Sequence, residues 1–192
     1  MREELNTADS KIAAIAGRQH GIVTVEQMRS AGLGRTELTR RVQAGRFHRL
    51  HRGVYAVGHR SLSWRGRWLA AMLAAGDGAV LSHTSAAALW KFLRPIPGPV
   101  HVLLGAAVSR KPRPGLQLHR SRTLKPRDVT HRHGIAVTTP ARTIEDIRGA
   151  VEPWLFRRAL RQAELGGHRV PHLSATRHAL RPRAALPRPL LG

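Results

Sequence analysis

The segment from Arg35 to Ala44 carries the side chains best suited to chemistry with a nucleic acid. Leu38 and Val42 are four residues apart, so they predict the apolar side of a helix. The opposite side carries hydroxyl, guanidinium and amide groups at Thr36, Thr39, Arg40 and Gln43. Arginine and glutamine can bridge two acceptors on a base edge, and threonine can donate, accept or touch a thymine methyl. The pattern predicts a recognition helix that contacts bases through these four residues.

Positive charge is concentrated around the same helix. Between residues 35 and 52 there are six arginines and a single acidic residue, Glu37. Such a segment is expected to contact the sugar-phosphate backbone, which supplies affinity and register more than sequence readout. The predicted backbone contacts are Arg35, Arg41, Arg46, His48, Arg49, His51 and Arg52. Glu37 and Arg41 are also four residues apart, so they can form an ion pair on the flank of the helix.

These side chains need a scaffold, and residues 9–58 predict one. Asp9 or Ser10 can cap a first helix, and Thr24 with Gln27 has the spacing of a capping box for a second. A glycine-containing turn joins the second helix to the third, and apolar–polar alternation around a later glycine predicts a hairpin. This is the order of a winged helix-turn-helix. A solvated face on any basic protein would show similar donors, but these flanking elements favour the DNA-binding interpretation.

The rest of the chain predicts a second module and a tail. In residues 61–166, helical stretches with broad apolar faces alternate with short strand-like runs, which predicts a small mixed α/β module. The predicted fold class is therefore α+β, with a winged helix-turn-helix at the N-terminus. Residues 168–192 hold five arginines, four prolines and no acidic residue. We therefore expect residues 167–192 to form a disordered basic tail.

Composition narrows the classes of partner. The chain has 192 residues, with 33 Lys and Arg against 11 Asp and Glu, which gives a formal net charge of +22. Such a surplus attracts polyanions, so nucleic acid is favoured over acidic membranes and acidic proteins. The absence of cysteine excludes disulfides and thiolate metal sites. No apolar run reaches the roughly 18 residues of a membrane span, and the N-terminus lacks an apolar signal region, so we expect a cytoplasmic protein with no membrane partner.

Two metal-dependent chemistries are less well supported. A nuclease needs clustered carboxylates around a hard cation, but Glu145 and Asp146 are neighbours on a predicted helix and point about 100° apart. His131 and His133 would point the same way on a strand and could be two zinc ligands. The remaining ligands would have to come from distant histidines or carboxylates. Solvated or phosphate-facing histidines are the favoured interpretation.

Nucleophilic catalysis is also poorly supported. Ser82 and His83 are adjacent in sequence, and adjacent side chains rarely aim at each other. The chain has no Gly-x-Ser-x-Gly elbow, and Ser82 is better interpreted as a helix cap. We therefore predict no catalytic residue, no metal site and no cofactor, and a protein that is not an enzyme.

The run GIVTVEQMRSAGLGRTELTRRVQAGRFHRLHRGVYAVGH strongly resembles the N-terminal winged-helix domain of the AbiEi family. These proteins are antitoxins and transcriptional regulators of type IV toxin–antitoxin systems. Later pieces, WRGRWLAAMLAAGDGAVLSHTSAAALW, PGPVHVLL, LHRSRTL and GIAVTTPARTIEDI, resemble the region that follows this domain in many such proteins. The resemblance covers roughly residues 10 to 165.

The resemblance implies a repressor that binds double-stranded DNA at inverted repeats in its own promoter. It also implies that the second module neutralises a nucleotidyltransferase-like toxin without forming a stable complex. Many similar proteins continue into a very-short-patch-repair-like endonuclease domain, which the residues after about Leu165 do not resemble. Two alternatives stay open: the truncated DNA-targeting part of such an endonuclease, or a protein-interaction module with incidental DNA binding. The sequence leaves the choice between monomer and dimer open.

Overall fold

The computed structural model describes residues 2–106 and 113–170 of the chain. Its α-helices are α1 (Arg2–Arg18), α2 (Val25–Ser30), α3 (Arg35–Gln43), α4 (Trp64–Ala75), α5 (His83–Leu89), α6 (Pro140–Ile147) and α7 (Pro153–Leu165), with one 3₁₀ turn, η1 (Pro126–Asp128). Its strands are β1 (Ile22–Thr24), β2 (Phe47–His51), β3 (Val54–Val57), β4 (Val80–Leu81), β5 (Val100–Gly105), β6 (Leu116–Ser121), β7 (Val129–Arg132) and β8 (Ile135–Thr138). None of the helices in this described part is long and apolar enough to cross a membrane.

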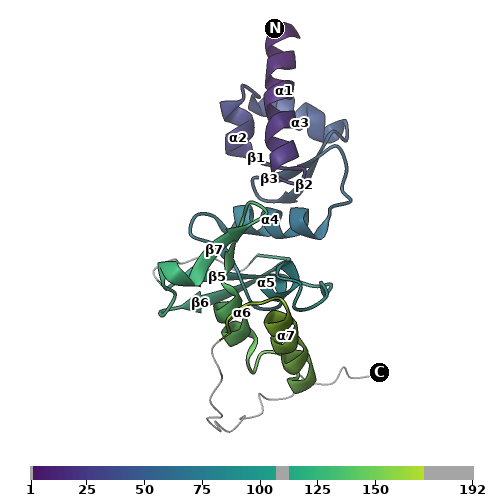
Figure 1. The fold of residues 1–192 in the computed structure, drawn as a ribbon. Helices are drawn as coiled ribbons and strands as arrows, with labels where there is room; N and C mark the ends of the chain where they lie inside the picture. Colours follow the sequence, from purple (N-terminus) through teal and green to yellow (C-terminus); the bar gives the residue numbers. More distant parts are fainter. Residues whose placement is uncertain (1, 107–112, 171–192) are drawn as a thin grey trace, which may run out of the picture.

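The elements are stacked in layers along one long axis (Figure 1). α1, α2 and α3 cover one face of a three-stranded sheet, and α4 lies against its other face. A five-stranded sheet follows on the far side of α4, and α5, α6 and α7 lie beyond it. The molecule is therefore a mixed α+β protein, which confirms the predicted fold class.

The first sheet completes the N-terminal helical unit. Its strand order is β1-β3-β2, and both pairings are antiparallel. β2 and β3 are joined by a tight turn at Arg52 and Gly53, and Gly53 has a φ of +77°, a conformation that favours glycine. Three helices, a first strand between α1 and α2, and a C-terminal hairpin form the order of a winged helix-turn-helix.

The starts of the first two helices were predicted with different success. Thr24 Oγ1 accepts a hydrogen bond from Gln27 N at 3.2 Å, and Gln27 Oε1 accepts one from Thr24 N at 2.9 Å, so the predicted capping box at α2 is confirmed. The prediction that Asp9 or Ser10 caps the first helix is wrong, because α1 begins at Arg2. The physical reason is local, because Arg2, Glu3, Glu4 and Leu5 are good helix formers and extend the helix toward the N-terminus. The Asp9 carboxylate, inside the helix, pairs with Arg41 of α3.

The second sheet mixes parallel and antiparallel pairs in the order β6-β5-β4-β8-β7. β5 is parallel to β6, and β4 is parallel to β8, whereas β4–β5 and β7–β8 are antiparallel. In the parallel pair, His101 lies beside Gln117 and Leu103 lies beside His119. Side chains at registered positions of parallel strands share a face, so His101 and His119 lie on one side of the sheet.

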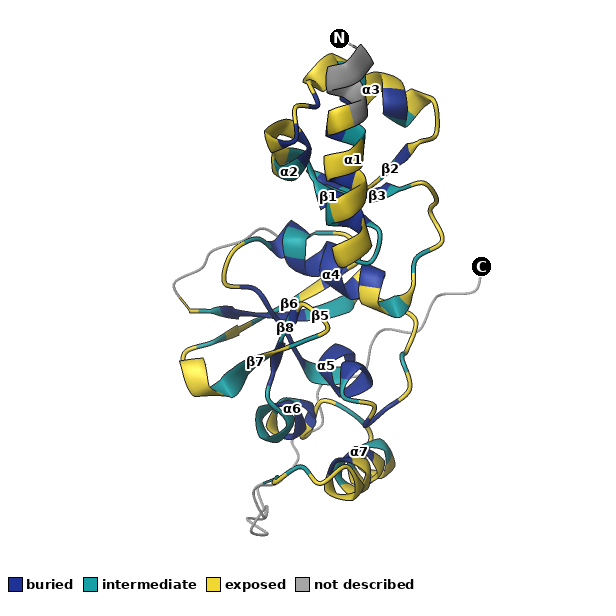
Figure 2. Ribbon diagram, turned by 45° about the horizontal axis from the view of Figure 1, so that its top comes forward, coloured by how far each residue is buried: buried dark blue, intermediate teal, exposed yellow. Residues whose placement is uncertain are grey.

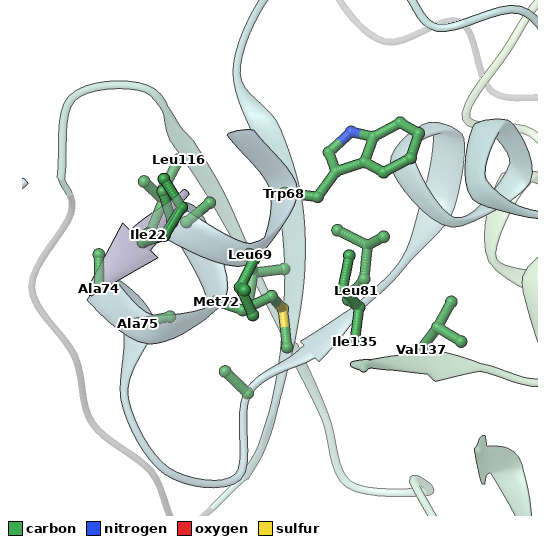
Figure 3. Close-up of a cluster of buried hydrophobic side chains, with 14 of the residues drawn as sticks. Ile22, Trp68, Leu69, Met72, Ala74, Ala75, Leu81, Leu116, Ile135 and Val137 are labelled. Atoms are coloured by element: carbon green, nitrogen blue, oxygen red, sulfur yellow. The ribbon is translucent and has the colours of Figure 1, made fainter. Parts of the chain in front are cut away.

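α4 joins the two halves through a shared core. Eight of its twelve residues are buried, and Figure 2 shows this helix as a largely buried band between the two sheets. Figure 3 shows Ile22 of the first sheet and Leu81 and Ile135 of the second grouped around the α4 side chains. The helix is hydrophobic on nearly all sides, as expected for an element packed between two layers.

α5, α6 and α7 bury a separate cluster on the far face of the second sheet. Phe92, Ile144 and Ile147 are each at most 2% exposed and pack with Ala159 and Ala163 of α7. This cluster packs α7, the last helix of the described chain, against the rest of the second module. Most of the predicted basic tail, from residue 171 on, lies outside the described residues.

The shared core predicts that a change in the winged-helix sheet destabilises the second module. Ile22→Ala removes a fully buried side chain that packs on α4, so we expect a loss of about 2–5 kcal/mol in the free energy of unfolding. All four tryptophans lie outside residues 10–58, so tryptophan fluorescence during urea unfolding reports on the second module. The fluorescence midpoint should fall in Ile22→Ala and stay unchanged in the control Ile96→Ala, whose side chain is exposed. An unchanged fluorescence midpoint in Ile22→Ala, with circular dichroism showing early loss of helix, would contradict the shared core.

Candidate nucleic-acid interface

A groove of about 730 Å³ opens between α2, α3 and the β2–β3 hairpin. Its polar lining includes five guanidinium groups against a single carboxylate, that of Glu26. The arginines are Arg29, Arg35, Arg49, Arg52 and Arg113. Thr39 and Gln43 add a hydroxyl and an amide from α3. The groove therefore combines a strong positive field with neutral donors and acceptors, which suits a phosphodiester chain beside base edges.

The groove collects part of the predicted set of DNA contacts. Its lining includes two predicted base contacts, Thr39 and Gln43, and three predicted backbone contacts, Arg35, Arg49 and Arg52. The other predicted base contacts, Thr36 and Arg40, are exposed on α3 but do not line the groove. Arg46 is also exposed and outside it. α3 therefore presents two polar faces, one toward the groove and one away from it.

The apolar side of α3 sets which face points to the groove. Leu38 is 8% exposed and packs in the core formed by α1, α2 and the first sheet, with Val42 packed against the same cluster. Thr39 donates its hydroxyl proton to the carbonyl oxygen of Arg35, one turn earlier, at 3.1 Å. This bond leaves the lone pairs and the methyl of Thr39 available to a ligand.

Arg41 corrects one prediction. It was expected to contact the DNA backbone, but it is only 5% exposed. Its guanidinium donates to Glu37 Oε1 through Nε at 2.6 Å and to Asp9 Oδ1 through Nη1, and it lies over the ring of Phe47 at 5.9 Å. A buried arginine already paired with two carboxylates is not available to a phosphate. Arg41 instead ties α3 to α1, and its predicted pairing with Glu37 is confirmed.

Glu37 also holds Arg40. The Arg40 guanidinium donates from Nε to Oε2 and from Nη2 to Oε1, both at 2.8 Å, although 69% of its side chain is exposed. Hydrogen bonds from Arg40 and then Arg41 lower the pKa of Glu37 to about 2. One carboxylate therefore orients two successive arginines of α3, one inward and one outward. To reach a base, Arg40 would have to exchange this partner.

The two histidines of the hairpin region are less available than predicted. His48 is half-buried, and its Nε2 donates to the carbonyl oxygen of Gly58 at 3.3 Å. His51 is half-buried and lies beside Gly115 of the second module. A Cβ added to that glycine would be 3.6 Å from His51 Cε1. Burial, and then the charge of Arg113, lower the pKa of His51. Both rings support the hairpin from its sides, and neither lines the groove.

Two of the arginines that line the groove were not predicted from the sequence. Arg29 lies in the last turn of α2, which the sequence analysis treated only as the helix that supports α3. Arg113 belongs to the second module, and its Nη1 donates to the carbonyl oxygen of Ala74 at the end of α4. No local pattern connects residue 113 with α3. Its position depends on the packing of the first sheet against α4.

The order of the elements in residues 9–58 is that of a winged helix-turn-helix, and one comparison with known proteins concerns this same part of the chain. Residues 10–58 match the model of a family described as transcriptional regulator, AbiEi antitoxin. The resemblance seen in the sequence is thereby confirmed for residues 10–58. No curated protein matches the chain.

The overall fold is also similar to a solved structure. The crystal structure of the Rv2827c protein from Mycobacterium tuberculosis aligns with 82% of this chain and 71% of its own, at 19% identity and a TM-score of 0.51. At this identity the similarity concerns the fold alone.

The Glu37 pair predicts how the stability of the protein depends on pH. Because the pKa of Glu37 falls from 4.5 to about 2 on folding, its ionised form stabilises the native state above pH 4.5. That contribution should be lost as the pH falls from about 4.5 toward 2. Thermal unfolding followed by circular dichroism should show a smaller decline in Tm over this window for Glu37→Gln than for the unchanged protein. Equal declines in the two proteins would show that Glu37 does not carry the effect, and Glu164→Gln, on α7, serves as the matched control.

Proposed function

We propose that this protein is a cytoplasmic transcriptional repressor, the antitoxin of a type IV toxin–antitoxin system, which binds double-stranded DNA at inverted repeats in its own promoter. The match of residues 10–58 to the AbiEi regulator family supports the class of protein. The observation that carries DNA binding is the arginine-lined groove, in which α3 and the hairpin hold five of the predicted contacts, Arg35, Thr39, Gln43, Arg49 and Arg52. In this proposal, the second module acts on a nucleotidyltransferase-like toxin without a stable complex.

The groove suggests how the duplex docks. α3 would enter the major groove with Thr39 and Gln43 toward the base edges. Arg49 and Arg52 on the hairpin would hold the phosphates beside it, and Arg35 would hold those near the start of α3. Because Arg113 lines the same groove, the second module would add a phosphate contact of its own.

A non-enzymatic role is part of the proposal. One carboxylate of α6 and one of η1 are engaged by a guanidinium, since Arg142 donates to Asp146 Oδ1 from Nε at 2.8 Å and to Asp128 Oδ2 from Nη1 at 3.4 Å. Burial raises the pKa of Asp146, although its bond to Arg142 opposes the change. A nuclease would need such carboxylates free to hold a cation. Their pairing supports a structural role for them.

Footprinting of the purified full chain on the DNA upstream of its own start codon tests the function directly. The proposal expects protection of inverted repeats at nanomolar protein, against much weaker binding to random duplex. Uniform protection of all sequences would contradict the proposed repressor function and would indicate that DNA binding is incidental. Cleavage of the probe after addition of Mg²⁺ would contradict the non-enzymatic proposal.

The two polar faces of α3 can be separated by substitution. If the groove face reads bases, Gln43→Ala should cost about 1–3 kcal/mol on the operator and relax the preference at one base pair. Arg40→Ala, on the other face, should then retain that preference. In the unchanged protein the Arg40 guanidinium is bonded to Glu37, so its removal takes away no base contact. Gel-shift titrations on the operator and on its single-base variants measure both effects. A loss of preference in Arg40→Ala with no change in Gln43→Ala would assign base reading to the outer face.

Arg52 should contribute affinity without sequence preference. Arg52→Ala removes one phosphate contact, so binding should weaken similarly on operator and random duplex, and the slope of log K against log salt should flatten by about 1. Arg127→Ala makes the same charge change at an exposed position outside the groove and is the matched control. The assignment fails if both substitutions change the salt slope equally.

A further inference from the structure

Three histidines converge on the far side of the second sheet, away from the arginine-lined groove. His83 is the first residue of α5, His101 lies on β5 and His119 lies on β6. One ring nitrogen of each lies within 4.8 Å of the others, and all three side chains are half-buried. This is the sole group of three potential metal-ligating side chains found in residues 2–106 and 113–170. We call it the histidine cluster.

The separations in the histidine cluster are close to those of a shared metal. His101 Nδ1 and His119 Nε2 lie 2.9 Å apart and form a hydrogen bond, and the His83 and His119 rings stack with centroids 3.6 Å apart. Nitrogens that share a tetrahedral Zn²⁺ at 2.0–2.1 Å lie about 3.4 Å apart. The His101–His119 pair would therefore separate by only about half an ångström as the metal replaces its hydrogen bond. His83 would turn its ring edge toward the pair.

The backbone holds these rings in place at a cost. His83 has a φ of +50°, a left-handed conformation that is unfavourable for a residue with a Cβ. Ser82 is the N-cap residue of α5, as predicted, but its fully buried hydroxyl makes no capping hydrogen bond; it lies 3.0 Å from His83 Nδ1 and orients that ring. The hydroxyl of Ser85 accepts a hydrogen bond from the backbone N–H of His101 at 3.0 Å. Of these two hydroxyls, that of Ser82 contacts a ring nitrogen, and a partner on the second ring nitrogen fixes the orientation of a metal-ligating histidine.

Burial favours the neutral form of the three rings, which is the form that binds a metal. Burial lowers the pKa of His83 to about 3 and that of His119 to about 4, and it also lowers the pKa of His101. Arg142 is the cation that acts on His83, and its charge is balanced by its pairs with Asp146 and Asp128. The positive field felt by an incoming metal ion at this point is therefore reduced.

We infer that His83, His101 and His119 form a binding site for Zn²⁺, with three imidazole ligands and a fourth position for water. Borderline nitrogen ligands select zinc and its transition-metal neighbours over Mg²⁺ or Ca²⁺. The ion would connect α5, β5 and edge strand β6 and so stabilise the second module. The site differs from the pair His131 and His133, which the sequence did not favour as ligands; His133 Nε2 is bonded to Arg65, and His131 is exposed. The inference does not depend on the proposed DNA binding.

The test uses the full chain, purified without a histidine tag and treated with a chelator. Addition of ZnCl₂ should give one equivalent of saturable binding by calorimetry and raise Tm by about 5–10 °C at saturating metal. MgCl₂ at the same concentration should leave Tm unchanged. Co²⁺ in place of Zn²⁺ should give the visible absorption of a four-coordinate ion with nitrogen ligands.

Paired substitutions identify the ligands. The double variant His101→Gln, His119→Gln should lose at least about 10–100-fold in Zn²⁺ affinity, since even residues that only orient ligands cause losses of this size. The control double variant, His59→Gln with His131→Gln, removes two exposed histidines and should bind as the unchanged protein does. If the cluster variant unfolds, the Co²⁺ spectrum of the unchanged protein decides, because six-coordinate Co²⁺ absorbs only weakly. Equal affinity in the two double variants, or no binding at one equivalent in the unchanged protein, would overturn the inference.

Discussion

The burial of α4 between two sheets is the constraint on which the rest of the structure depends. Trp68, Ala71 and Met72 are each under 8% exposed, so the helix offers most of its surface to one sheet or the other. Neither sheet can bury its apolar face without this helix, and the two halves are joined by one continuous core. This packing brings Arg113 of the second module to the groove beside α3. The candidate interface therefore includes one residue of the second module besides those of the N-terminal domain.

The three arginines of α3 differ in their contacts because they lie on different sides of the helix. Arg35 lines the groove, Arg40 is exposed, and Arg41 is buried beneath the helix. Glu37 stabilises this division, because its two carboxylate oxygens accept bonds from Arg40 and Arg41. In a chain with a net charge of +22, such pairs reduce repulsion where cations are close together. A high arginine content is thus only partly a nucleic-acid signal.

The histidine cluster and the groove lie in different layers and use different chemistry. The groove arginines are charged and mostly exposed, as suits phosphates that arrive with the solvent. The imidazoles of the cluster are half-buried and held neutral by burial. Successive members of the cluster, His83, His101 and His119, are 18 residues apart, far beyond any helix or strand period. The parallel pairing of β5 with β6 and the position of α5 bring them together.

The sequence by itself determined features that depend on near neighbours. The capping box at Thr24, the turn at Gly53 and the apolar side of α3 each follow from contacts within a few residues, so local periodicity and cap chemistry were enough to predict them. The tertiary structure alone decided the role of Arg41, because its burial depends on Asp9, 32 residues away. It alone decided that Arg113 joins the groove and that three distant histidines meet. Side chains far apart in sequence are brought into contact by how layers pack, and single-chain periodicity carries no information on that packing.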